Sequence, residues 1–216
     1  MNAQDILDFL HQHPEFFDEH PDLLAQLTVP HPVNGQAISL TERQLLTLRE
    51  KLAQVQGKLS ELVSFGEEND VIAEKVHRLC LSLLLAEDFE SVNYAVYTHL
   101  QDDFAVPHVA LRIWNSILKR PCGEFIEVSE ALRFFAADLS RPYCGPAQFP
   151  EILDWFGEPG RHLASMALIP LRRDAQVFGM LALGSEDPQR FFPEMGTLYV
   201  ERIGELVGAA VLKQIG

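Results

Sequence analysis

The stretch 164-ASMALIPLRRDAQVFGMLALG-184 decides the fold of this chain. It holds two apolar runs of strand length, 164–171 and 176–184, separated by the turn residues Arg172-Arg173-Asp174-Ala175. Apolar runs bounded by turn residues indicate strands, so we expect an antiparallel hairpin here. A terminal helix should follow from Phe192-Pro193 to Gln214. Its expected buried stripe comprises Met195, Leu198, Ile203, Leu206, Ala210 and Val211.

Residues 106–114 predict another strand, upstream of this hairpin. With the two-residue period of a strand, Val109, Leu111 and Ile113 point to one side, which we expect to pack under helices. The opposite side carries His108, Ala110, Arg112 and Trp114.

The segment between this strand and the hairpin is expected to be less regular. Residues 121–128 suggest an edge strand, and 129–158 a loop-and-helix excursion over the second face of the sheet, with 141–146 at its centre. Helices are expected over 72–83 and 88–101. This order of elements predicts an α+β fold, an antiparallel sheet with helices packed on one face.

Residues 1–35 have an unusual composition, with six acids, four of the eight His and no Lys or Arg. Within them, His13-Pro14-Glu15-Phe16-Phe17 recurs seven residues later as His20-Pro21-Asp22-Leu23-Leu24. Proline is tolerated in the first turn of a helix, so we expect short helices over 3–12, 14–19 and 21–27. A break at Pro30, Pro32, Asn34 and Gly35 should follow.

A long helix is predicted to begin at Ser39-Leu40-Thr41-Glu42, which matches the capping-box pattern. Apolar residues then recur in alternating steps of three and four, typical of a two-helix seam. The candidate dimerisation residues are Leu45, Leu48, Leu52, Val55, Leu59 and Leu62. The alternative is packing of the same stripe on its own domain. Gly66 and the polar residues 67–70 are expected to interrupt the helix.

Composition excludes several classes of protein. The formal net charge of −14 opposes direct binding to nucleic acid, because such binding requires clustered cations. No membrane span and no secretory signal are expected, so we place the chain in the cytoplasm. Three widely spaced cysteines without a C-x-x-C pair predict free thiols.

The closing segment resembles the end of GAF domains, which typically read S-x-x-x-I-P-L, a hairpin, G-x-L-x-L and a helix. The matching residues are 165–171 and 177–185, and the resemblance covers 88–216. The whole chain also resembles the bacterial domain-of-unknown-function family 484. That resemblance is carried by Phe16-Phe17 before 20–24, the helix start at 39–42, and Ala182-Leu183-Gly184-Ser185-Glu186-Asp187.

The GAF resemblance implies a sensory or regulatory module that binds a small molecule or mediates dimerisation. The residue sets of the cyclic-nucleotide and bilin-binding subgroups are not found, so no cofactor is assigned. The second resemblance implies a protein partner, a tyrosine recombinase, because the family's genes are often associated with one. We therefore divide the chain into 1–37, a short-helix segment; 38–87, a dimerisation region; and 88–216, a GAF-like domain.

The strand 106–114 supplies the first candidate ligand residues. His108, Arg112 and Trp114 share a face, where Arg112 could hold an anion and Trp114 could stack on a ring. The alternative is that Arg112 pairs with an acid such as Glu127 or Asp138 while Trp114 fills the core.

Tyr143, Cys144 and Gly145 of the excursion complete the candidate ligand set. Cys144 could be a reactive thiol if Arg141 lowered its pKa, which would make the chain a thiol oxidoreductase with Cys122 as a second cysteine. The His residues of the N-terminal segment have no ligand spacing, and no metal site or catalytic motif is assigned. The sequence thus predicts a homodimeric, non-catalytic regulatory module, with the thiol enzyme or a ligand-free scaffold as alternatives.

Overall fold

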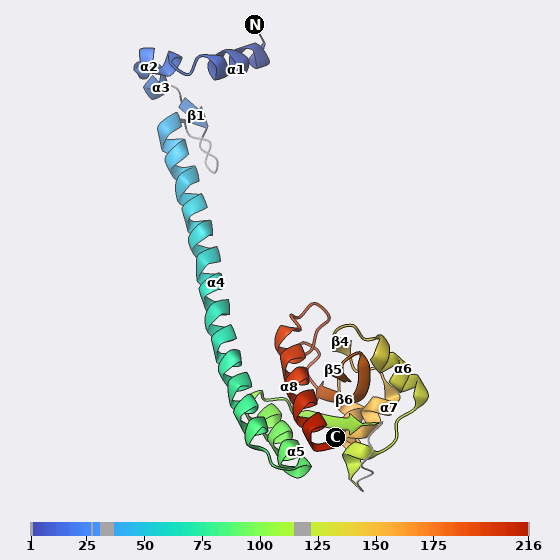
Figure 1. Ribbon diagram of the computed structural model, residues 1–216. Helices are drawn as coiled ribbons and strands as arrows, with labels where there is room; N and C mark the ends of the chain where they lie inside the picture. Colours follow the sequence, from blue (N-terminus) through green and yellow to red (C-terminus); the bar gives the residue numbers. More distant parts are fainter. Residues whose placement is uncertain (1, 27, 31–36, 115–121, 216) are drawn as a thin grey trace. The chain divides into compact units, whose positions relative to one another are not determined.

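The computed structural model describes residues 2–26, 28–30, 37–114 and 122–215, with only the backbone between 24 and 42. The chain divides into two compact units, Met1–Glu67 and Glu68–Gly216, which we describe separately. Figure 1 shows the elements in chain order.

Unit 1 opens with three short helices, α1 (Ala3–Gln12), α2 (Phe16–Glu19) and α3 (Pro21–Gln26). They confirm the three helices expected from the sequence. A two-stranded antiparallel pair that we did not predict follows, β1 (Thr28–Pro30) with β2 (Ala37–Ser39). Of the predicted break, Pro30 is the last residue of β1, and Pro32, Asn34 and Gly35 lie outside the described residues.

A single helix, α4, then runs from Leu40 to Leu85 without interruption. The interruption predicted at Gly66 and 67–70 is therefore wrong. A glycine inside a helix costs only about 1 kcal/mol, and polar residues such as Glu are good helix formers. The apolar pattern is interrupted at these residues, but the helix continues through them. The capping-box side chains at 39–42 lie outside the described part of the chain.

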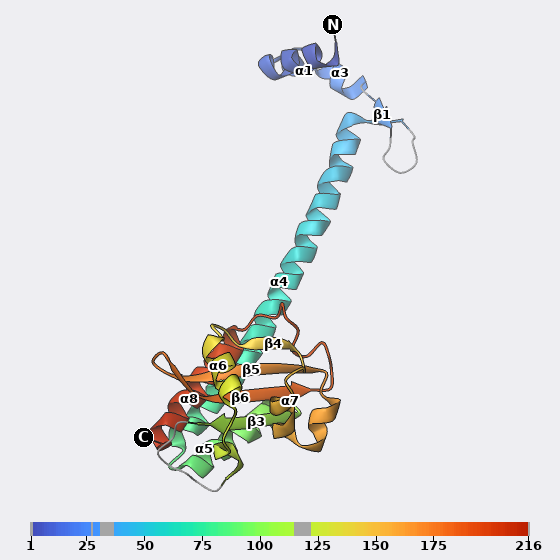
Figure 2. The same cartoon turned by 90° about the vertical axis from the view of Figure 1, so that its right-hand side faces the viewer.

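Unit 2 contains a four-stranded antiparallel sheet of order β3-β6-β5-β4 (Figure 2). Its strands are β3 (His108–Ile113), β4 (Tyr143–Pro146), β5 (Ser165–Arg173) and β6 (Gln176–Ser185). The predicted hairpin is confirmed: β5 and β6 pair along their lengths and turn at Asp174, whose φ of 54° lies in the left-handed region that Asp tolerates.

The edge strand predicted within 121–128 is wrong. Residues Gly123–Phe125 form a 3-10 turn, and β4 from the centre of the excursion pairs with β5 instead. The prolines and glycine of 142–146 suggested a loop, but Pro146 ends a strand at the edge of the sheet, where proline is tolerated.

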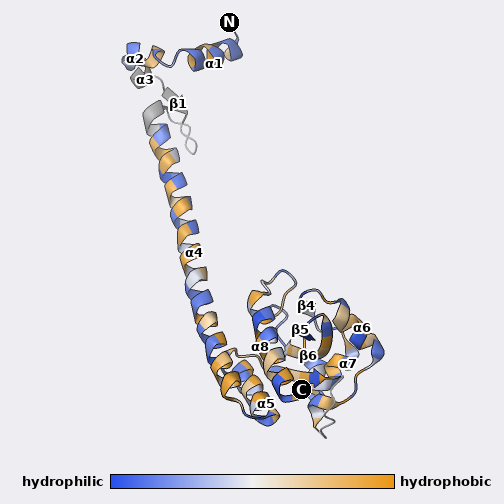
Figure 3. Ribbon diagram, in the orientation of Figure 1, coloured by the Kyte–Doolittle hydropathy of each residue, from blue (hydrophilic) through white to orange (hydrophobic). Residues whose placement is uncertain are grey.

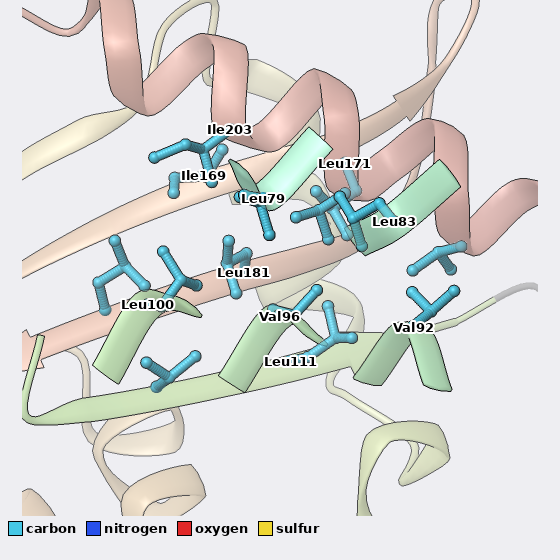
Figure 4. Close-up of a cluster of buried hydrophobic side chains, with 14 of the residues drawn as sticks. Leu79, Leu83, Val92, Val96, Leu100, Leu111, Ile169, Leu171, Leu181 and Ile203 are labelled. Carbon is cyan, nitrogen blue, oxygen red and sulfur yellow. The ribbon is translucent and has the colours of Figure 1, made fainter. Parts of the chain in front are cut away.

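One face of the sheet packs on helices, as the alternation in β3 predicted. Val109, Leu111 and Ile113 belong to a core shared with α5 (Phe89–Thr98), the end of α4 and α8 (Leu198–Ile215). Figure 4 shows Leu79 and Leu83 of α4 beside the residues of α5 and α8 that cover the sheet. A π-helical turn, His99–Asp103, connects α5 toward β3.

Helix α8 begins at Leu198, six residues later than predicted. The connection contains Pro193 and Gly196, which favour a turn over a first helical turn. Ile203 and Val211 are buried as expected, whereas Leu198 is exposed and Leu206 and Ala210 are half-buried. Their places on the buried face are taken by Val200, Gly204, Val207, Gly208 and Ile215.

Two glycines of α8 provide a matched test of this packing. A Cβ at Gly204 would lie 2.3 Å from Ile169 Cγ2, whereas one at Gly208 would meet Leu171 at an ordinary 3.9 Å. We expect Gly204→Ala to lower the free energy of unfolding by about 1–3 kcal/mol. Gly208→Ala should raise it by about 0.5–1 kcal/mol through helix propensity. Urea unfolding measures both, and equal effects would contradict this close approach of α8 to β5.

Candidate functional site

The second face of the sheet is covered by the excursion, through α6 (Glu130–Asp138), α7 (Pro150–Leu153) and the 3-10 turns Asp154–Phe156 and Glu158–His162. This arrangement follows the prediction. Ser129 caps α6 through Leu132 N–H, and both its N–H and its hydroxyl donate to the Glu151 carboxylate at the start of α7. The two helices are thus tied together at their N-terminal ends.

The space between this face and the excursion is filled by the chain's own side chains. Trp114 is 4% exposed and donates its indole N–H to the carbonyl of Val177 (3.1 Å). Around it lies a core of Ala110, Val128, Leu132, Ala136, Ile152, Met166, Leu168, Val177, Met180 and Ala182. Trp114 therefore has the core position that the sequence left as an alternative.

Arg112 lies on the same face and is half-buried. Its guanidinium stacks on the Trp155 ring (5.2 Å to the centroid) and donates to the Leu111 carbonyl (2.9 Å). Burial lowers the pKa of Arg112, opposed by the charges of Tyr97 and Glu124. Glu124, rather than the expected Glu127 or Asp138, is the acid that influences it.

The same contacts protect an edge of the sheet. β3 is an edge strand, so the outward N–H and C=O of Leu111 have no strand partner. The Tyr97 hydroxyl accepts the N–H (3.3 Å), and Arg112 donates to the carbonyl. This pair of side chains thus satisfies the outward polar groups of Leu111 at the sheet edge.

The remaining predicted ligand residues are divided between the two faces. His108 contacts Phe156 ring to ring (6.4 Å), and Tyr143 packs on the same side, its hydroxyl donating to the Pro146 carbonyl (2.9 Å). Gly145 lies under the Tyr143 ring, whose Oη would be 2.8 Å from an added Cβ. Burial raises the pKa of Tyr143.

Cys144 points the other way, into the helix-side core, because successive strand residues alternate between faces. Its burial raises the pKa of the thiol to about 11. The structure therefore separates Cys144 from the other five predicted ligand residues, and the pKa shift is opposite to the one that Arg141 was expected to cause.

A cavity of about 520 Å³ that we did not predict lies beside α5. Its lining residues are Phe89, Glu90, Asn93, Tyr94, Tyr97, Cys122 and Glu124. Asn93 donates to the Glu124 carboxylate (3.0 Å), and its buried Oδ1 has no hydrogen-bond partner among the described residues. Burial and the nearby Glu124 raise the pKa of Tyr97. The cavity thus combines aromatic walls with the Glu124 carboxylate.

A chain of polar side chains joins the end of α4 to the π-helical turn. Arg78 pairs with Asp103 (3.0 Å), Asp103 contacts His99 Nδ1 (2.6 Å), and His99 Nε2 lies 2.7 Å from Ser82 Oγ. The order is that of a hydrolase triad, but Ser82 lies within α4, whose N–H groups are engaged in the helix and cannot stabilise an oxyanion. The cluster ties the end of α4 to the π-helical turn within unit 2. Sequence analysis missed this cluster, because a His and an Asp four residues apart, such as His99 and Asp103, do not by themselves indicate a site.

The N-terminal histidines lie in aromatic and ionic contacts. His13 pairs with Glu15 (3.0 Å) and stacks on Phe9, while His20 stacks on Phe16. His31 lies outside the described residues. In the part of the chain that the structure describes, no helix is long and apolar enough to cross a membrane.

The apolar stripe of α4 lies open to solvent. Figure 3 shows hydrophobic residues recurring along the helix. Each of the six predicted dimerisation residues is between 51% and 66% exposed: Leu45, Leu48, Leu52, Val55, Leu59 and Leu62. Such values are unusual for large apolar side chains that recur on one face of a helix.

A family model described as "Protein of unknown function, DUF484" matches residues 1–213, nearly the whole chain. The chain belongs to this family. Its relatives include the YigA proteins of Salmonella typhimurium, 23% identical, and Escherichia coli, 24% identical. Each alignment covers 92% of this chain and 86% of the relative.

Solved structures confirm the GAF-like fold of this DUF484 chain. The GAF domain of A. aeolicus Nlh2 in an inactive state matches with a TM-score of 0.50 at 16% identity, over 67% of this chain and 98% of that domain. The GAF domain of a phosphoenolpyruvate-protein phosphotransferase from Coxiella burnetii also gives 0.50, at 13% identity, over 66% and 93%. At these identities the likeness establishes the fold alone.

The three thiols provide a test of the site geometry. With a pKa of about 11, Cys144 is ionised at pH 8 in roughly one molecule in a thousand. We expect iodoacetamide to modify the half-buried Cys80 and Cys122 first, with Cys144 reacting at least tenfold more slowly, as mass spectrometry of digests would measure. In urea all three should react alike. Preferential modification of Cys144 in the native chain would revive the thiol enzyme.

Proposed function

We propose that this DUF484 chain is a regulatory module that functions as a homodimer, carries out no catalysis and acts by binding a protein partner. The observation that carries the proposal is the exposed heptad stripe of α4, on a helix that is continuous with a GAF-like domain.

The stripe fits self-association better than any other use of the helix. Its apolar positions recur strictly in steps of three and four, which makes a narrow seam suited to a second helix of the same kind. Leaving six large apolar side chains in water is unfavourable by about 25 cal/mol per Å² of apolar surface. A second copy of α4 would cover them with an identical stripe.

The two core clusters argue against catalysis as the main role. The space where GAF domains hold ligands, between sheet and excursion, is filled by Trp114, Met166 and Met180 among others. Cys144 is buried with a raised pKa, which opposes thiolate chemistry. When its own side chains fill the interior of a domain, recognition takes place on the surface. We therefore propose that the domain binds a protein.

A matched pair of double variants tests the dimer. Leu52→Asp with Leu59→Asp places charges opposite one another in the seam, so the chain should become monomeric. Ala53→Asp with Ser60→Asp adds the same charges one position along the helix, at exposed sites outside the stripe, and should leave the dimer intact. Sedimentation equilibrium at tens of micromolar measures both. A monomeric parent chain, or equal behaviour of the two variants, would refute the seam.

The cavity beside α5 supports a second candidate, the sensing of a small molecule. The Glu124 carboxylate offers acceptor oxygens between aromatic walls, so the ligand would be planar and carry N–H donors.

Native mass spectrometry of freshly purified protein separates the two candidates. We expect two copies without a retained small molecule, because we assign recognition to the surface. A retained molecule that is lost in Glu124→Gln but kept in the control Glu127→Gln would favour the sensing role.

A further inference from the structure

The first helices of unit 1 form an amphipathic element with an uncovered apolar face. Helix α1 is well capped: Asn2 accepts from the N–H of Asp5 (2.9 Å), and the Asp5 carboxylate accepts from the N–H of Asn2 (2.8 Å). Phe9 then packs edge-on against Phe16 of α2 (5.9 Å). The two helices are therefore held together by aromatic contact.

This element buries none of its own residues. No residue of α1 or α2 is buried, and Ile6, Leu7 and Phe9 are between 43% and 52% exposed. An isolated helix of ten residues is marginal in water, since most helical stability comes from packing an apolar face. The sequence thus encodes a capped amphipathic helix whose apolar face stays about half exposed, even with Phe9 in contact with Phe16.

The charge around this face is of one sign. Residues 2–26 carry six carboxylates and no Lys or Arg, and the first Lys or Arg in the sequence is Arg43. The carboxylates belong to Asp5, Asp8, Glu15, Asp18, Glu19 and Asp22. At neutral pH carboxylates border the apolar face. Their negative potential favours a partner whose surface potential is positive.

We propose that α1 and α2 dock into an apolar groove with a basic rim on a protein other than this chain. Ile6, Phe9 and Phe16 would enter the groove, in the mode of an amphipathic helix, and the acids would face cations at its border. The inference rests on the proposed function only in that the partner is a protein, and it assigns the surface and the chemistry of that partner.

Charge decides between the proposed occupant and its rivals. A second copy would bring six further carboxylates against the first six, and like charges at an interface oppose association. An anionic lipid surface repels the segment for the same reason, whereas membrane-binding amphipathic helices are rich in Lys and Arg. A cationic rim is the complement that remains.

The test uses the full chain and a defined probe, a fluorescent amphipathic helical peptide of Leu and Lys, with a Leu and Glu peptide of the same pattern as control. Anisotropy should show binding of the Lys peptide alone, weakening as NaCl rises from about 50 to about 200 mM. Phe9→Ser should weaken binding roughly tenfold, as expected for a central apolar anchor. Phe134→Ser removes another exposed Phe, on α6, and should have no effect.

Charge-matched variants exclude general attraction to an acidic protein. Asp5→Asn with Asp8→Asn should weaken binding at least fivefold, whereas Glu158→Gln with Glu186→Gln removes the same charge elsewhere and should change it less than twofold. Equal losses, or no loss in Phe9→Ser, would overturn the proposal. Binding to anionic vesicles, or a change in the melting of unit 2 in Phe9→Ser, would also overturn it, by assigning the face to lipid or to this chain.

Sedimentation of the same variants keeps this test separate from that of the dimer. The Phe9→Ser chain should remain dimeric, because the seam lies in α4. A monomeric parent chain that still binds the Lys peptide would refute the dimer and leave the docking surface standing.

Discussion

The structure of unit 2 depends on burying the β5–β6 hairpin from both sides. In β6 every residue from Val177 to Ser185 is buried, so neither face of this strand tolerates water. The serines at the end of the hairpin also have hydrogen-bond partners within the unit. Ser165 of β5 donates to the Asp187 carbonyl (2.6 Å), and Ser185 of β6 accepts from the Asp187 N–H (3.1 Å). An antiparallel sheet that is apolar on both faces needs two covers, and helices α4, α5 and α8 supply one while the excursion supplies the other.

The second cover determines what kind of site the domain can hold. Trp114, Met166 and Met180 are large, and together with their close-packed neighbours they fill the space between the sheet and the excursion. Arg112 sits at the border of this packing, stacked on Trp155 and bonded to its own strand, so its charge serves the edge of the sheet. Polar residues on a strand face indicated a binding site from the sequence, and the structure shows Arg112 bonded to the edge of its own strand.

The parts of the fold that follow from local periodicity could be predicted, and those that depend on distant partners could not. The alternation in β3, the hairpin at Asp174 and the three N-terminal helices are local patterns, and each is confirmed. β4 was missed because Pro146 and Gly145 suggest a loop unless β5 is known to lie beside them.

The candidate site shows the same limit. Cys144 was grouped with Tyr143 by proximity in sequence, although a residue that is read as a loop has no predictable face. Once 143–146 is known to be a strand, alternation alone separates the two side chains. The cavity beside α5 depends on Asn93 and Glu124, which are 31 residues apart and come together only through tertiary packing.

One heptad pattern runs along helix α4, and its two parts differ in exposure. The seam positions Leu48, Val55 and Leu62 continue at seven-residue spacing through Asn69 to Val76 and Leu83. Val76 and Leu83 belong to the core of unit 2, whereas the first three are exposed. Gly66 and Asn69 mark the change, where the pattern loses its large apolar residues and the helix continues. The sequence left packing on its own domain as the alternative for this stripe, and periodicity alone could not separate the two readings, because the same spacing marks both the buried and the exposed residues.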